Sequence, residues 1–335
     1  MPDTLPLVTI YLSERCNSRC VTCDYWRHGT RDFSLESTRR MLRDLRALGT
    51  RDVLISGGEP LLNPEWREIA ALLGSNGMDL WLLTSGLSLA KHAADAARLF
   101  RSITVSLDGT RADTYAAIRG VDAFDKVCEG VRAVVAAGVP TSLRVTLQQT
   151  NFRELPRFVA LARELGVCEV SFLAVDVGNP HAFARREPLS LALALDADDV
   201  AELDRLLGAL EHDHAGDFAS GFIAESPAKL RHIRNYFAAL AGLGEFPPVR
   251  CNAPEFSAVV GADGRVSPCF FIGGPALAPR APELKAAIDS APMRALRAAI
   301  RDDERPECRR CVCSMWREPR RLDETAFMLE AAGNA

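Results

Sequence analysis

The chain has 335 residues, of which 48% are hydrophobic and 25% are charged. This is the composition of an ordinary globular protein, and the length allows one large α/β domain and a smaller one. A net charge of −4 with both signs interspersed creates no positive potential that would attract nucleic acid or an anionic membrane. No apolar run approaches the ~18 residues that a membrane span needs, and the N-terminus lacks the pattern of a secretion signal.

The ten cysteines fall mostly into two groups, one near each end of the chain. In a long chain without a secretion signal, clustered cysteines indicate metal sites in a reducing compartment rather than disulfides. We therefore expect a cytoplasmic protein.

The first 175 residues alternate apolar, β-branched runs with amphipathic segments. We expect strands at 7–13, 52–56, 80–84, 102–107, 142–147 and 169–175. We expect helices at 35–47, from 63 onward, and at 90–100, 114–118, 124–137 and 155–165. Ser34 is the expected N-cap of the first helix, and Asn63-Pro64 begins the second. Six strand–helix alternations are typical of parallel βαβ units.

Three cysteines directly follow the first expected strand, in the segment Cys16-Asn17-Ser18-Arg19-Cys20-Val21-Thr22-Cys23. Thiolates select iron–sulfur clusters, zinc or copper(I). A structural zinc site needs four ligands, and no fourth Cys or His follows nearby. Three thiolates can instead hold a cubane cluster and leave one iron open to a small molecule. A zinc site or three buried cysteines is the alternative.

A second motif, Gly57-Gly58-Glu59-Pro60, closes the second expected strand. Glycines let a backbone approach a ligand closely, and Glu59 offers a carboxylate to an ammonium group. The C-x3-C-x2-C spacing together with this GGEP segment resembles the radical S-adenosylmethionine (radical SAM) superfamily.

The resemblance implies a partial (β/α)6 barrel of the TIM type, with the active site at the carboxyl ends of the strands. It implies a [4Fe–4S] cluster on Cys16, Cys20 and Cys23, and SAM bound in part by the Gly57–Pro60 segment. One departure is Thr22, because many members of the superfamily carry an aromatic residue at that position.

Further polar segments follow the other expected strands, and the resemblance extends to them. Thr84 follows the third strand. Ser106, with Arg119 downstream, resembles a pair that contacts the methionyl part of SAM, although Asp108-Gly109 is alternatively a simple turn and Arg119 an exposed helix charge. Asn151, after the fifth strand, matches a position used on SAM and is alternatively a helix N-cap.

Residues 176–250 carry no chemical motif, and we expect a helical connector that covers the barrel mouth, with helices at 196–210 and 227–240. The remaining boundaries follow from this: a barrel at 1–175, an auxiliary module at 251–316 and a C-terminal tail at 317–335. Cys128 and Cys168 have the positions of buried small hydrophobic residues.

The auxiliary module begins at Cys251 and continues with a hairpin, in which Gly261-Ala262-Asp263-Gly264 is the turn and Val266-Ser267-Pro268-Cys269 begins the return strand. An Ala-rich helical stretch at 282–301 leads to Cys308, Cys311 and Cys313. This pattern resembles the SPASM module of radical SAM enzymes or its shortened form, twitch, and implies a β-hairpin-plus-helix domain with a second [4Fe–4S] cluster. Zinc is the alternative here.

Four thiolates complete a cubane, and this region has five cysteines. The resemblance assigns Cys251, Cys269, Cys308 and Cys311 as ligands and leaves Cys313 free, although Cys313 could replace Cys251. A free thiol near a substrate radical can donate a hydrogen atom. The alternative is a spare cysteine without a role.

The resemblance implies that SAM is cleaved to a 5′-deoxyadenosyl radical, which takes a hydrogen atom from a carbon of the substrate. The first expected strand begins close to Met1, so we expect no leader-peptide-binding domain and a small-molecule substrate. We expect epimerisation of a sugar, aminoglycoside or nucleoside-type natural product, with Cys313 as hydrogen donor. The alternatives are dehydrogenation of an alcohol carbon, maturation of a ribosomal peptide, and a zinc-stabilised binding protein. The expected partner is an electron donor such as flavodoxin or ferredoxin.

Overall fold

The computed structural model describes residues 4–180, 182–274 and 283–318. Its strands are β1 (Leu7–Ser13), β2 (Asp52–Gly57), β3 (Asp79–Thr84), β4 (Ser102–Ser106), β5 (Thr141–Leu147), β6 (Glu169–Ala174), β7 (Ser257–Val260) and β8 (Val266–Ser267). Its α-helices are α1 (Tyr25–His28), α2 (Leu35–Ala47), α3 (Trp66–Ser75), α4 (Leu89–Leu99), α5 (Ala112–Arg119), α6 (Phe124–Ala136), α7 (Leu155–Glu164), α8 (Ala197–Asp213), α9 (Ala215–Ala219), α10 (Pro227–Leu240), α11 (Ala253–Phe256), α12 (Leu284–Ile288) and α13 (Ala291–Arg301). None of the described helices is long and apolar enough to cross a membrane.

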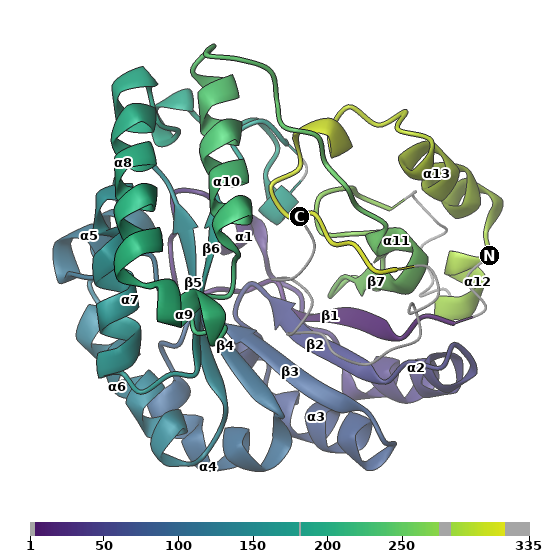
Figure 1. Cartoon of the computed structure of the whole chain (residues 1–335). Helices are drawn as coiled ribbons and strands as arrows, with labels where there is room; N and C mark the ends of the chain where they lie inside the picture. The colour runs from purple at the N-terminus through teal and green to yellow at the C-terminus, as the bar shows by residue number, and fades with distance from the viewer. Residues whose placement is uncertain (1–3, 181, 275–282, 319–335) are drawn as a thin grey trace.

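The strands form one eight-stranded sheet in the order β6-β5-β4-β3-β2-β1-β7-β8 (Figure 1). Strands β1 to β6 are all parallel, and each pairs with its neighbours in the chain. This confirms the predicted α/β fold with a partial barrel. The sheet is open, because β6 and β8 lie at its two edges.

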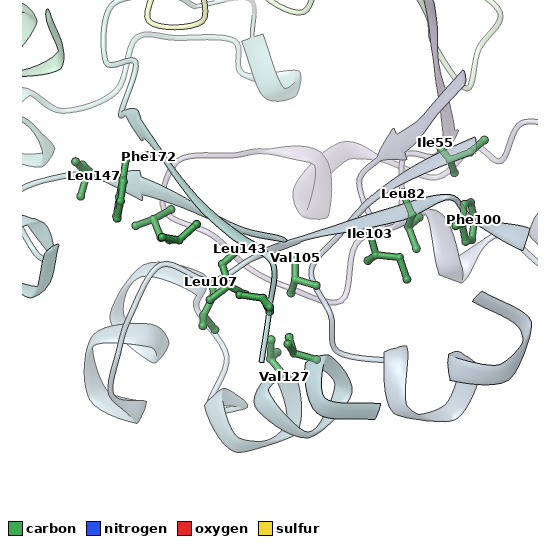
Figure 2. Packing of buried hydrophobic residues seen from close by; sticks show 14 of the residues in the cluster. Ile55, Leu82, Phe100, Ile103, Val105, Leu107, Val127, Leu143, Leu147 and Phe172 are labelled. Carbon is green, nitrogen blue, oxygen red and sulfur yellow. The ribbon is translucent and has the colours of Figure 1, made fainter. Parts of the chain in front are cut away.

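Alternation along each strand gives the sheet one apolar and one polar face. On β5, Leu143, Val145 and Leu147 are buried against the outer helices, and Ser142 and Arg144 lie on the other face. Figure 2 shows the outer layer, where Val105 and Leu143 of neighbouring strands pack with Val127 of α6. The polar face lines the inside of the partial barrel, which we call the lumen. The fold therefore leaves hydrophilic side chains where a ligand can enter.

The predicted helix caps are largely confirmed. The Ser34 hydroxyl accepts a hydrogen bond from the Ser37 N–H at 3.1 Å, as an N-cap does. Helix α3 begins two residues later than Asn63-Pro64 indicated. The Asn63 side chain accepts from the Glu65 N–H but uses its amide group to donate to the Leu12 and Phe33 carbonyls. It therefore ties three loops together.

Three other predictions differ from the structure. The polar segment after residue 210 is helical, because α8 runs to Asp213 and α9 follows. The stretch predicted as one helix at 282–301 is two helices, because Ser290 caps a new helix by accepting a hydrogen bond from the Met293 N–H. Residue 282 lies outside the described residues. Cys168 is exposed rather than buried. Its thiol reaches the Thr141 carbonyl across the barrel bottom, whereas Cys128 is buried as predicted.

The C-terminal hairpin is part of the barrel sheet. Strand β7 pairs in parallel with β1, and β8 pairs antiparallel with β7. The predicted hairpin is confirmed, but its attachment to β1 was not expected. The boundaries at 175, 250 and 316 stay predictions, and most of the predicted tail lies outside the described residues.

Candidate functional site

The loop that carries the first three cysteines is held by the end of α5. The Arg19 N–H donates to the Arg119 carbonyl at 2.8 Å, and the Val21 N–H donates to the Ile118 carbonyl at 3.0 Å. Carbonyls in the last turn of a helix have no partner within the helix, so the loop satisfies them. Gly120 follows in the left-handed region with φ of 68°, and a side chain there would meet the Arg19 carbonyl. The fold thus fixes the loop at the carboxyl ends of the strands.

The three thiols of this loop lie close enough to influence one another. Burial, with a smaller contribution from neighbouring cysteines, raises the pKa of Cys16 to about 11 and that of Cys23 to about 12. Burial also raises the pKa of Cys20, against the effect of Arg119. Within the described residues, no three Cys, His, Asp or Glu side chains are arranged to hold a single metal ion. A cubane does not require that arrangement, since each thiolate binds a different iron.

The Gly57-Gly58 pair packs against the cysteine loop. A Cβ on Gly57 would lie 2.4 Å from the Ser13 carbonyl oxygen, and one on Gly58 would lie 2.5 Å from that of Arg15. Gly57 also has a φ of 127°, which favours glycine. The N–H groups of Gly58 and Glu59 donate to the Ser13 and Arg15 carbonyls. These glycines therefore bring the second strand end against the first.

Glu59 is fully buried, and protein donors surround its carboxylate. Thr84 Oγ1 donates at 2.8 Å, Ser85 Oγ at 2.6 Å and the Ser85 N–H at 2.8 Å. The Leu61 N–H donates as well. Glu59 and Thr84 thus join the ends of β2 and β3, and Pro60 is buried beside them. Their contact with SAM stays a prediction.

Asp108 organises the segment after β4. Arg119 donates to it at 3.0 Å, and the Thr146 N–H donates to its other oxygen at 2.7 Å. Burial lowers the pKa of Arg119, but Cys20 and Asp108 raise it more, so that its net shift is upward. Asn151 is buried; its amide donates to the Asp108 and Thr146 carbonyls and accepts from the Gln148 N–H. It joins two loops and does not cap its helix through the side chain.

Several buried polar atoms around this loop have no hydrogen-bond partner among the residues that the structure describes. They are Ser18 Oγ, Tyr115 Oη, Arg119 Nε and both amide atoms of Gln148. Unpartnered buried polar atoms are costly, and sites that bind a polar ligand account for them. Ser106 makes no side-chain hydrogen bond in the described residues and is half-buried. Three neighbouring thiols beside such atoms fit a cluster with a polar organic ligand.

The C-terminal cysteines form a second group. Cys251 and Cys308 both influence the thiol of Cys269, whose pKa burial raises to about 12. Cys313, Cys251 and Cys269 likewise influence Cys311, Cys313 most strongly. The backbone joins these segments, since the Met315 N–H donates to Cys251 Sγ at 3.5 Å and the Cys313 N–H donates to Cys311 Sγ at 3.4 Å. All five cysteines are thus neighbours, one more than a four-thiolate cluster requires.

Cys313 differs from the other four in its surroundings. Burial raises the pKa of its thiol, and Arg144 of β5 opposes that rise, as does Lys229 of α10. Lys229 donates to the adjacent Ser314 at 2.9 Å. Cys313 therefore lies within electrostatic range of two cations, one on β5 and one on α10. No sequence motif marks Arg144, because it is a single charge within an apolar strand.

Comparison with known proteins gives a consistent picture. Residues 10–162 match the profile described as "Radical SAM superfamily". Fe-coproporphyrin III synthase of Methanosarcina barkeri is 29% identical over 205 residues, which cover 59% of this chain and 51% of that protein. A probable GTP 3′,8-cyclase of Saccharolobus solfataricus is 32% identical over 170 residues, covering 49% of this chain and 55% of that protein. The chain spans about half the length of these curated relatives.

Two solved structures share the fold over most of the chain. Streptococcus suis SuiB bound to S-adenosylmethionine has a TM-score of 0.66 at 15% identity, covering 93% of this chain and 73% of SuiB. Native anSMEcpe with bound AdoMet and Cp18Cys peptide has a TM-score of 0.64 at 19% identity, covering 92% and 89%. The sequence match, the parallel sheet and the cysteine loop agree. Residues 10–162 therefore form a radical SAM domain, and the C-terminal cysteines are consistent with an auxiliary module.

Proposed function

We propose that this protein is a radical SAM epimerase that inverts one carbon of a small molecule such as a sugar, an aminoglycoside or a nucleoside-type natural product. Cys16, Cys20 and Cys23 hold the first cluster, with SAM bound beside Gly57–Pro60, Thr84, Ser106, Arg119 and Asn151. Cys251, Cys269, Cys308 and Cys311 hold the second. When bound, the first cluster and SAM supply a 5′-deoxyadenosyl radical.

The residues of this chain position the substrate, exclude water and return the hydrogen atom. A hydrogen atom leaves the substrate carbon on one face and ends on 5′-deoxyadenosine. The S–H bond of Cys313 then breaks, and a new C–H bond forms on the opposite face. The thiyl radical left on Cys313 takes one electron and one proton, the electron coming from a donor such as flavodoxin or ferredoxin.

One observation carries the choice of epimerisation: Arg144 and Lys229 influence the thiol of Cys313, and its group has five neighbouring cysteines, one more than a four-thiolate cluster needs. A small-molecule substrate is supported by relatives named for GTP and Fe-coproporphyrin III. SuiB, which was solved with a precursor peptide, shares only the fold at 14% identity. A peptide is therefore the weaker alternative.

A dehydrogenase is the second candidate. Cys311 and Cys251 both lie near Cys313, so Cys313 can replace Cys251 as a ligand. No thiol would then return the hydrogen atom, and the substrate radical would lose an electron and a proton to give a ketone, with the auxiliary cluster as electron acceptor.

Anaerobic turnover in deuterated water separates the two candidates. Candidate glycosides and nucleosides are incubated with the reconstituted protein, SAM and a reductant. An epimer that carries one solvent deuterium supports the epimerase, because thiol protons exchange with water. An oxidised product without deuterium supports the dehydrogenase. The Cys313→Ala variant should still form 5′-deoxyadenosine but no epimer, and Cys168→Ala is the control, because Cys168 is exposed and lies at the barrel bottom.

A further inference from the structure

Arg144 is a charged side chain on the polar face of the sheet, inside the barrel. Its cross-strand neighbours are Ser106 of β4 and Ser171 of β6. Its Nε donates to the Ser171 hydroxyl at 3.1 Å. This bond orients the guanidinium, because it fixes one of the five N–H groups of the fork.

The rest of the guanidinium has no partner among the described residues. No carboxylate of the described residues lies within the 4.0 Å of an ion pair with Arg144. Its two terminal nitrogens make no hydrogen bond there, and neither is enclosed by protein. These nitrogens can therefore donate to a ligand that carries negative charge and enters the barrel.

The acidic groups nearest to Arg144 have other surroundings. Glu169 lies at the start of β6, and burial raises its pKa against the effect of Arg144. Burial raises the pKa of Glu225 to about 7, and its carboxylate accepts from the Phe172 N–H at 2.7 Å. Both lie beyond ion-pair distance from Arg144, so they leave the terminal nitrogens of its fork open to a ligand.

Arg144 lies near two groups of the proposed reaction, the SAM-binding segment and the hydrogen-donating thiol. On one side stands Ser106, which is proposed to contact SAM. Cys313, the proposed hydrogen donor, lies within electrostatic range of Arg144 and Lys229. A substrate anchored on Arg144 would therefore lie near both Ser106 and the thiol.

We propose that Arg144, oriented by Ser171, binds an oxyanion of the substrate, a carboxylate or a phosphate. This inference rests on the proposed function, because it identifies the substrate as an anionic small molecule. Two parallel N–H···O bonds from the fork fix the direction of the substrate as well as its affinity. Lysine supplies a point charge without that fork and should replace arginine only in part.

The test measures anion binding to the reconstituted, SAM-loaded full chain by isothermal titration. Inorganic pyrophosphate and succinate are the two probes, in separate arms that distinguish phosphate from carboxylate. The variants are Arg144→Met, Arg144→Lys and Ser171→Ala. Arg101→Met is the matched control, because Arg101 is an exposed arginine that already pairs with Asp79 at 3.4 Å. Formation of 5′-deoxyadenosine without substrate is measured on every variant.

One of the two probes should bind the wild type and Arg101→Met equally well. Arg144→Met should weaken that binding about tenfold or more, as expected for the loss of a charge-assisted hydrogen bond. Arg144→Lys and Ser171→Ala should lie in between. Ser171→Ala keeps the test available if Arg144→Met does not fold. Formation of 5′-deoxyadenosine without substrate should be the same in Arg101→Met as in the wild type.

Three results would overturn the proposal. They are no binding of either probe to the wild type, equal binding to Arg144→Met, or loss of SAM affinity in Arg144→Met, which would assign Arg144 to SAM. Failure of the proposed function is a different result, because the wild type would then form no 5′-deoxyadenosine whatever the titration shows.

Discussion

At the scale of single residues, Glu59 shows how a predicted ligand group can also serve the structure. Its carboxylate accepts hydrogen bonds from Leu61, Thr84 and Ser85 while fully buried. The sequence predicts the motif correctly, because its glycines and acid have a fixed spacing. It does not predict these partners, because they come from the next strand and depend on packing.

Replacing Glu59 with glutamine should lower the free energy of unfolding by about 3 kcal/mol. The amide N–H₂ group would face N–H and O–H donors that now donate to the carboxylate, and these donors would lose their acceptor. Urea unfolding measures the change. Glu65→Gln is the matched control; that half-buried carboxylate accepts one backbone bond, from the Leu35 N–H at 3.0 Å, so the loss should be about 1 kcal/mol. Equal losses would show that the bonds to Glu59 contribute little.

Glu225 makes stability depend on pH. Burial raises its pKa from 4.5 to about 7, so the folded state holds a proton that the unfolded state has released between these values. Stability should therefore fall as pH rises from about 4.5 to 7, by roughly 3 kcal/mol. Glu225→Gln should flatten this slope in urea unfolding at several pH values, leaving the smaller part from Glu169, whose pKa burial also raises. An unchanged slope would contradict the assignment.

At the scale of elements, the end of α5 supports the cysteine loop. Gly120→Ala would place a Cβ 2.2 Å from the Arg19 carbonyl oxygen, in a residue with φ of 68°. Gly138→Ala is the control, because Gly138 has φ of 82° but no atom within 4 Å of its Cβ position. The free energy of unfolding of both variants should fall by ~1 kcal/mol, because alanine is strained in the left-handed region. That of Gly120→Ala should fall by about 1–3 kcal/mol more because of the clash.

The clash should also be visible in the metal content. Gly120→Ala should hold less iron on the first cluster after reconstitution, and Gly138→Ala should hold as much as the wild type. Equal iron content in the two variants would show that the cysteine loop does not depend on its contact with the end of α5.

The elements themselves were largely predictable, since each strand of the barrel is a short apolar run between turn signals. Strand β1 has the predicted bounds, and α2 has the predicted cap. The break between α12 and α13 was not predicted from the Ala-rich sequence. It occurs because the Ser290 hydroxyl accepts a hydrogen bond from the Met293 N–H, which starts a new helix in place of a continuous one. The pairing of β7 with β1 was also missed. It joins segments far apart in the chain, and no local pattern encodes that contact.

At the scale of the whole molecule, the C-terminal module is attached to the barrel through β7, and its Cys313 lies within electrostatic range of Arg144. The choice of ligands can be tested by iron content. Cys311→Ala should lose about half of the iron of a protein with two cubanes, and Cys313→Ala should lose none. A loss of iron in Cys313→Ala would make Cys313 a ligand and favour the dehydrogenase.

The central claim is that Cys16, Cys20 and Cys23 hold a cluster on which SAM is cleaved. The most direct measurement is formation of 5′-deoxyadenosine by the anaerobically reconstituted protein with SAM and dithionite, compared with the variant in which these three cysteines are alanine. The account predicts 5′-deoxyadenosine from the wild type, none from the variant, and iron with sulfide in the wild type. A wild type that binds zinc and releases no 5′-deoxyadenosine would contradict it.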